Sequence, residues 1–194
     1  MMKQLFKFPP EQAPTLTQEW VEAIVVGLNL CPFAAPEVKN KAIRYAVSHG
    51  DKAEAVVQDF LTELDKIQNA EETELSTTLL CFTQVADDFE EFLDILDICQ
   101  QNLESSGLDG VFQLASFHPE YCFSGVDKDD ITNWTNRAPF PTIHLIREGQ
   151  MSRVLTHFKK PDEIPERNMA LMETLGKQGL IQKFPPLAQY WAED

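Results

Sequence analysis

The sequence lacks the features that mark exported and membrane-spanning proteins. Its four cysteines, at positions 31, 81, 99 and 122, form no C-x-x-C pair, and residues 1–10 contain no apolar core of a secretory signal. No apolar run approaches the ~20 residues that cross a bilayer. Isolated thiols without an export signal favour a reducing compartment over a disulfide-stabilised fold. We therefore expect a cytoplasmic protein with no membrane partner.

Positive charge is also missing from a long central part of the chain. Residues 67–127 contain thirteen Asp and Glu but no Lys or Arg, and the net charge of the whole chain is −15. Such an acidic protein repels nucleic-acid phosphates, so no nucleic-acid partner is expected. Against this background Arg137 and Arg147 stand out because they bracket His144. A small anionic ligand would find its positive partners there.

What the sequence does contain is a regular alternation of helical and strand patterns. Apolar residues at helical spacing follow capping signals at Thr15, Asp51 and Asp87 or Asp88, and Pro32 ends the first of these helices near Asn29 or Cys31. Short segments that are apolar and rich in β-formers predict strands at residues 42–47, 77–82, 111–117 and 142–147. Two later helices are predicted at residues 152–158 and from Ile164 to Gly176 or Gly179.

This order predicts an α/β fold: one domain over residues 1–194, a sandwich with flanking helices on a sheet of about four strands, mostly parallel or mixed. We expect residues 1–14 to form an extended arm and residues 181–194 a docked tail. The oligomeric state and the isomer of the bond before Pro141 stay open.

Two histidines mark the segment of residues 117–148 as a candidate site. His118 follows the third predicted strand, at the end where open α/β sheets bind ligands, and Tyr121 adds a hydroxyl on the same loop. On the fourth strand His144 and Ile146 share one face, while Arg147 is on the other. A buried imidazole stays neutral, which suits a general base. A structural histidine that only hydrogen-bonds a nearby loop is the alternative.

Cys31 is the best candidate for a nucleophile, because Pro32 and Pro36 constrain its backbone. A thiol becomes reactive when an imidazolium, an arginine or a helix N-terminus lowers its pKa. The alternative is an inert, buried cysteine at a helix end. A metal site would draw on Cys31, His118, Cys122 and His144, but their spacing matches no standard zinc pattern, and no metal or other cofactor is predicted.

Three motifs occur in order at residues 28–34 (LNLCPFA), 117–123 (FHPEYCF) and 136–148 (NRAPFPTIHLIRE). Together they resemble an uncharacterised bacterial family, domain of unknown function 1415. The segment IPERN at residues 164–168 resembles it too, so the resemblance spans most of the chain. Family members often carry serine and tyrosine where this chain has Ala138 and Phe140. The resemblance implies no particular activity.

Two functional hypotheses follow. The first is a small cytoplasmic enzyme in which Cys31 is the nucleophile or redox centre and His118 or His144 is the base. Its anionic substrate would be bound by residues that carry polar or positive groups in the same segment, namely Tyr121, Asn136, Arg137 and Arg147. The second is a non-catalytic module that binds a small anion, a metal or a partner protein through the same pocket. The enzyme is favoured because anion binding requires arginines but not a cysteine beside two histidines.

Overall fold

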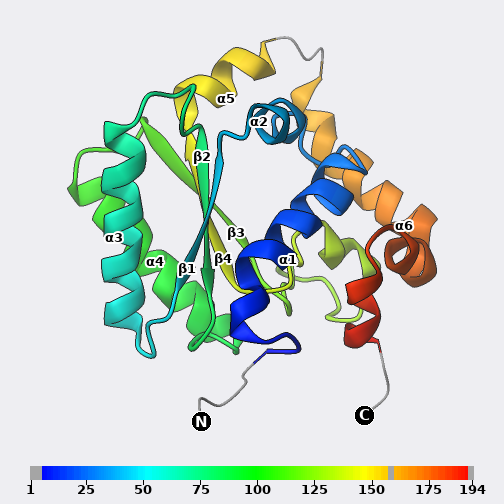
Figure 1. The fold of residues 1–194 in the computed structure, drawn as a ribbon. Coiled ribbons are helices and arrows are strands. Elements are labelled where there is room, and N and C mark those ends of the chain that lie inside the picture. Colours follow the sequence, from blue (N-terminus) through cyan, green and yellow to red (C-terminus); the bar gives the residue numbers. More distant parts are fainter. Residues whose placement is uncertain (1–5, 157–159, 192–194) are drawn as a thin grey trace.

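A four-stranded mixed sheet forms the centre of the computed structural model, which describes residues 6–156 and 160–191 (Figure 1). The strands are β1 (Ile43–Ser48), β2 (Thr77–Phe82), β3 (Phe112–Phe117) and β4 (Thr142–Arg147), in the order β1-β2-β4-β3. Strands β1 and β2 are parallel, and β4 is antiparallel to both of its neighbours. The predicted α/β fold is confirmed, with the mixed form of the sheet.

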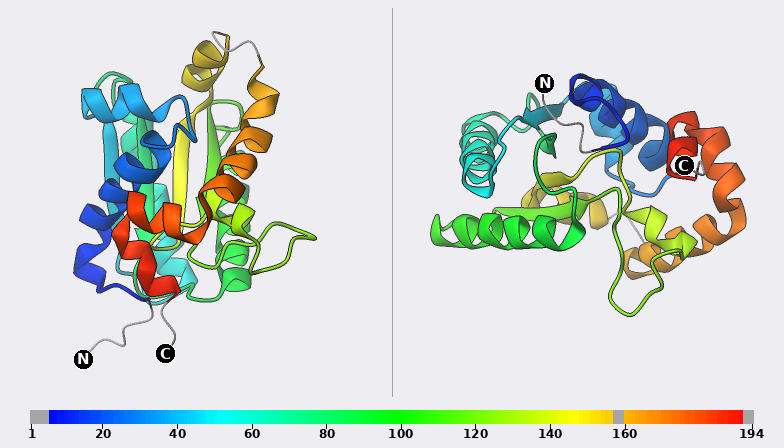
Figure 2. Two further views of the ribbon diagram at one scale, coloured as in Figure 1. Left: turned by 90° about the vertical axis from the view of Figure 1, so that its right-hand side faces the viewer. Right: turned by 90° about the horizontal axis from the view of Figure 1, so that it is seen from below.

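Helices cover both faces of this sheet (Figures 1 and 2). One face carries α3 (Ala53–Asn69) and α4 (Phe89–Ser105). The other carries four helical segments, which are α1 (Ala13–Trp20), η2 (Val21–Val26), α2 (Ala34–Asn40) and α6 (Ile164–Lys183). The remaining helical segments are η1 (Pro10–Gln12), η3 (Ile131–Thr135), α5 (Glu148–Leu155), η4 (Pro161–Glu163) and η5 (Pro185–Tyr190).

The alternation of side chains along the strands creates a separate core on each face. Strand β2 is buried along its whole length. Its Leu79 and Cys81 belong to the cluster beneath α1 and α6, whereas Leu80 and Phe82 belong to the cluster beneath α3 and α4. A residue's place in the strand therefore decides which core it enters.

The helix patterns were predicted less well than the strands. The first helix changes into the π-helical segment η2 at Val21, and the chain then turns at Asn29, whose φ is 53°. The short helix α2 after this turn was not predicted. Helix α5 begins at Glu148, earlier than expected, and the predicted end of that helix lies partly outside the described residues. Helix α6 continues to Lys183 through a kink at Gly176.

Segments near the two ends of the chain pack on the same core. Phe8 is buried against the ring of Tyr190, with the ring centroids 5.9 Å apart. The outermost residues of the predicted arm and tail lie outside the described parts of the chain. Within those parts every peptide bond is trans, including the one before Pro141, and no helix is long and apolar enough to span a bilayer.

Candidate functional site

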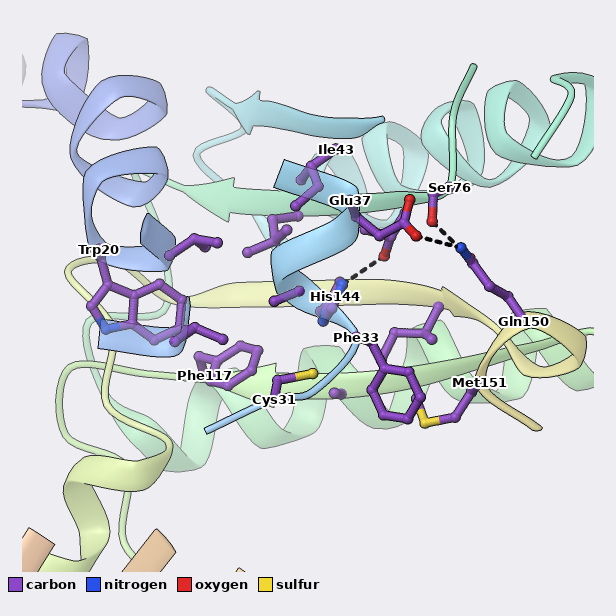
Figure 3. A pocket seen from close by; sticks show the side chains of 17 residues that line it. Trp20, Cys31, Phe33, Glu37, Ile43, Ser76, Phe117, His144, Gln150 and Met151 are labelled. Atoms are coloured by element: carbon purple, nitrogen blue, oxygen red, sulfur yellow. Dashed lines mark hydrogen bonds between the residues drawn. The ribbon is translucent and has the colours of Figure 1, made fainter. Parts of the chain in front are cut away.

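A cavity of about 180 Å³ lies between the sheet and the helices η2, α2 and α5 (Figure 3). Most of its wall is apolar and includes the side chains of Trp20, Val21, Val25, Phe33, Ile43, Leu79, Phe117, Ile146 and Met151. Its polar side chains are Cys31, Glu37, Ser76, Thr77, His144 and Gln150. Cavities of roughly 150 Å³ are known to hold a benzene molecule, so a small organic ligand fits here.

His144 reaches this cavity from β4 and is oriented by its neighbour on β2. The hydroxyl of Thr77 donates its one hydrogen to the carbonyl oxygen of Leu145, at 2.5 Å. The same hydroxyl lies 2.6 Å from His144 Nε2 and has no second hydrogen, so it must accept a hydrogen bond from Nε2. Nε2 thus carries the proton and Nδ1 keeps its lone pair. Burial lowers the pKa of His144 to about 4, so the imidazole is neutral at pH 7.

Cys31 enters the same cavity from the turn between η2 and α2. Helix α6 holds that turn from outside, because Arg167 donates to the carbonyl of Asn29 at 2.5 Å and Asn168 donates to the carbonyl of Leu30 at 2.8 Å. Asn168 is itself buried. The sequence folds this way because Asn29 readily adopts a positive φ and Pro32 prevents η2 from continuing. Helix α6, which is distant in sequence, thus fixes the turn between η2 and α2 and with it the position of the Cys31 thiol.

The surroundings of the Cys31 thiol act on its pKa in opposite directions. Burial raises the pKa above its ordinary value, while hydrogen bonds from the backbone N–H groups of Phe33 and Ala34 oppose this rise. The thiol points into the cavity between Phe33 and Phe117, and the free ring nitrogen of His144 lies on the side facing it (Figure 3). No direct hydrogen bond joins Cys31 to His144 in the described structure. In catalytic sites such bonds often form only with substrate present.

Cys31 also borders a second, wider cavity of about 580 Å³ between η3, α6 and the loop that follows β3. Val25, Cys31 and Phe117 line both cavities, so the thiol lies where they adjoin. Asn136, one of the predicted substrate-binding residues, lines this second cavity, and its side-chain amide donates to the carbonyl of Ser116. A ligand in either cavity would therefore contact the same cysteine.

His118 lies on the opposite face of the sheet from His144. It is fully buried, with its ring 5.2 Å from each of the rings of Phe89 and Phe92. Nε2 donates to the carbonyl of Ala86 at 3.0 Å, and Nδ1 accepts from the backbone N–H of Glu120 at 3.0 Å. Burial lowers its pKa to about 4. Both nitrogens are occupied by main-chain groups, so the geometry matches the structural alternative for this histidine.

Arg137 and Tyr121 belong to the loop that follows β3. The guanidinium of Arg137 donates to the carbonyls of Tyr121, at 3.0 Å, and Lys128, at 2.6 Å, and lies over the ring of Trp134. The ring of Tyr121 packs against Phe89. Neither Arg137 nor Tyr121 lines the cavity around His144. Arg137 therefore stabilises the loop between β3 and β4 by joining its own segment to the segment of residues 121–128.

Arg147 shares its strand with His144 but points to the other face, as the alternation along β4 requires. Its guanidinium donates to the carbonyls of Ile67, Ala70 and Leu75, the shortest distance being 2.5 Å. These carbonyls lie at and just beyond the C-terminal end of α3, a favourable place for a cation. Arg147 thus fastens α3 to the sheet and contributes no charge to the cavity.

A chain of hydrogen bonds among Ser76, Gln150 and Glu37 connects the residue before β2 to α5 and α2 at the wall of the cavity. Ser76 donates to Gln150 Oε1 at 2.7 Å, and Gln150 Nε2 donates to Glu37 Oε1 at 2.9 Å (Figure 3). The first bond fixes which end of the Gln150 amide faces Glu37, because the hydroxyl hydrogen must meet the amide oxygen. The carboxylate is thus held at one end of the cavity.

The four residues considered as metal ligands do not converge. His118 and His144 lie on opposite faces, and the thiol of Cys122 donates to the carbonyl of Val126 at 3.3 Å. Within residues 6–156 and 160–191, no group of three or more His, Cys, Asp or Glu side chains is placed to hold a metal ion.

Sequence reasoning did not identify Glu37, Ser76, Thr77 or Gln150 as site residues. Thr77 sits in an ordinary strand pattern, and Gln150 in a helix that was predicted to begin later. For Asn168 a signal existed, since the segment of residues 164–168 was among the motifs shared with the family.

Comparison with known proteins adds a family but no relative of known activity. No curated protein and no solved structure matches the chain. A family model described as protein of unknown function (DUF1415) matches residues 12–182, and the chain therefore belongs to that family.

Proposed function

We propose that this protein is a small thiol enzyme in which Cys31 is the nucleophile and His144 is the general base, acting on a small and largely apolar substrate. The observation that supports it is that both side chains line one cavity, with Thr77 holding the imidazole so that its lone pair is free. A nucleophile, a base and a residue that orients the base are the parts of a covalent catalytic site.

The proposed step begins from a neutral thiol and a neutral imidazole. The sulfur bonds to an electrophilic carbon, and the leaving group departs with the electron pair of its bond. The thiol proton passes to Nδ1 of His144 and then to the leaving group. Water next attacks that carbon and displaces the sulfur, which regains a proton. Because the pKa of His144 is low and that of Cys31 is raised, proton transfer has to accompany attack rather than precede it.

This proposal replaces the anionic substrate expected from the sequence with an apolar one. The guanidinium groups of Arg137 and Arg147 donate to main-chain carbonyls away from the cavity. The four free cysteines agree with a reducing compartment such as the cytoplasm, where Cys31 stays a thiol. A binding module without chemistry is the alternative, and the same cavity would then hold its ligand.

The pH dependence of Cys31 alkylation tests this proposal. Iodoacetamide labelling of each cysteine is followed by mass spectrometry from about pH 5 to 8. A thiol that reacts only as free thiolate gains about tenfold in rate per pH unit below its pKa, whereas a base-assisted thiol reacts at a nearly constant rate above the pKa of its base. We expect a plateau for Cys31 in the wild type. In His144→Gln we expect the tenfold dependence and a rate at pH 6 about 100-fold lower.

Two controls accompany this measurement. Cys122, which is partly exposed and lies outside this cavity, is the reference thiol in the same molecule, and His118→Gln should leave the Cys31 plateau in place. If wild-type Cys31 follows the tenfold dependence and His144→Gln does not change it, the enzyme proposal is wrong.

A further inference from the structure

We infer that the cavity beside Cys31 selects small amines, with the ammonium group at Glu37 and an apolar body against Trp20, Phe33 and Phe117. The inference rests on the proposed function only in placing substrate in the same cavity. It concerns which molecules enter, and it does not depend on what Cys31 then does to them.

The first support is the charge of the wall. Three of the lining side chains are ionisable, Cys31, Glu37 and His144, and no lysine or arginine is among the described residues that line the cavity. The imidazole is neutral because its pKa is about 4, and burial keeps the thiol protonated. The carboxylate of Glu37 is therefore the fixed charge of the wall. In surroundings this apolar, a single charge attracts an opposite charge more strongly than at the open surface.

The second support is the direction of the hydrogen bonds. The hydroxyl hydrogens of Ser76 and Thr77 are both committed, to Gln150 Oε1 and to the carbonyl of Leu145. Nδ1 of His144 is an acceptor, and among residues 6–156 and 160–191 no donor is paired with Oε2 of Glu37. One N–H of Gln150, the thiol and the indole N–H of Trp20 are the remaining side-chain donors, and the Trp20 ring lies at the end of the cavity away from Glu37 (Figure 3). At the end of the cavity beside Glu37, the second carboxylate oxygen is an unused acceptor, which matches a ligand whose head group donates.

The third support is that the carboxylate is held in place. Gln150 donates to one carboxylate oxygen and is itself fixed by Ser76, whose side chain is buried. These residues come from α5 and from the start of β2, while Glu37 comes from α2, so three elements converge on one end of the cavity (Figure 3). A positioned carboxylate with an apolar compartment beside it is the arrangement that recognises an ammonium group on an apolar body.

Three methanethiosulfonate reagents of different charge test the inference on Cys31. The 2-aminoethyl reagent is cationic, the 2-sulfonatoethyl reagent is anionic and the methyl reagent is neutral. In each case the cysteine sulfur forms a disulfide with the reagent's sulfenyl sulfur, methanesulfinate leaves with the electron pair, and the thiol proton goes to solvent. Rates at Cys31 are divided by those at Cys122 in the same molecule, which removes intrinsic differences between the reagents.

We expect the cationic reagent to be preferred over the anionic one at Cys31, and Glu37→Gln to reduce that preference about tenfold. Glu54→Gln removes the same charge from an exposed position on α3, on the other face of the sheet, and should leave the preference unchanged. Equal rates for the two charged reagents in the wild type, or a preference that survives Glu37→Gln, would overturn the inference. If Cys31 reacts with none of the reagents in the folded protein, the proposed function is wrong, and the selectivity for amines is then decided by the binding measurement below.

A binding measurement without covalent chemistry separates the selectivity for amines from the proposed role of Cys31 as nucleophile. Benzylamine and benzoate have the same ring but opposite charge, and each is titrated against the wild type and against Cys31→Ser by calorimetry. We expect benzylamine to bind more tightly than benzoate in both proteins, and Glu37→Gln to remove the difference. Tighter binding of benzoate would overturn the inference while leaving the role of Cys31 as nucleophile standing.

Discussion

His118 and His144 lie on opposite faces of the sheet and differ in their hydrogen-bond partners. His118, beneath α4, and His144, beneath η2 and α2, are both neutral imidazoles whose pKa burial lowers to about 4. His118 has a main-chain partner at each nitrogen. His144 has one partner, Thr77, and its second nitrogen lies at a cavity. A lowered pKa therefore does not mark a functional histidine here. The two histidines differ in that only His144 has a hydrogen-bonding position that no main-chain group occupies, and for this reason we propose His144 as the base.

Arg147 and His144 show the same difference between the two faces. Arg147 lies three residues after His144, yet it closes the end of α3 on the opposite face. One strand thus supplies a residue to the cavity and another to the packing of the far layer. Nearness in sequence along a strand brings two side chains to the same face only when their separation is even.

Replacing each histidine by alanine should separate the two faces most strongly. We expect His118→Ala to lower the free energy of unfolding by about 3 kcal/mol, because it leaves a hole beside Phe89 and Phe92 and removes the hydrogen-bond partner of the Ala86 carbonyl and of the Glu120 N–H. His144→Ala removes one hydrogen bond at the wall of an existing cavity and should cost about 1 kcal/mol. Urea denaturation of both variants measures the difference. Equal losses would mean that the cavity wall is packed as tightly as the far core.

Acid titration sharpens the comparison. Both histidines have a native pKa of about 4, below their ordinary value, so the unfolded chain binds protons that the folded chain excludes. Their contribution to stability is therefore complete above pH 6.5 and is lost as the pH falls towards 4, at about 1.4 kcal/mol per pH unit for each histidine.

The matched variants for this titration are His118→Gln and His144→Gln. We expect His118→Gln to flatten the pH dependence of unfolding by the full amount for one histidine. His144→Gln should flatten it by the same amount, because both native pKa values are about 4, and a smaller effect would show that water in the cavity weakens the burial of that ring. Histidine proton resonances followed from pH 7 to about 4 give the native pKa directly, and protonation of His118 near pH 6.5 would contradict its burial.

The smallest expected effect concerns the turn that carries Cys31. Asn168→Ala removes the hydrogen bond to the carbonyl of Leu30 and should lower the unfolding free energy by about 1 kcal/mol. If the hydrogen bond from α6 positions the thiol, the labelling rate of Cys31 should also change by several-fold while that of Cys122 does not. Thr174→Ala, on an exposed part of the same helix, is the control for both readouts. An unchanged Cys31 rate would limit Asn168 to a structural role.

Much of the fold was predictable because it depends on local patterns. All four strands lie within one residue of their predicted ranges, since short apolar β-rich segments between turn signals are read directly from the sequence. The helix α2 was missed because it follows the turn at Asn29 and contains Pro36, which obscures a pattern of only seven residues. The candidate site was half predicted. Cys31 and His144 share a cavity, while Glu37, Thr77 and Gln150 carry no signal of their own in the sequence.

The sequence by itself determined the strands, the alternation along β4 that separates His144 from Arg147, and the motifs of the family to which the chain belongs. Only the tertiary structure decided that Cys31 shares a cavity with His144 rather than with His118, and that both predicted arginines bind main-chain carbonyls. The reason is physical. Secondary structure follows from neighbours along the chain, whereas the partners of a polar side chain depend on which elements pack against it, and those elements lie far away in sequence.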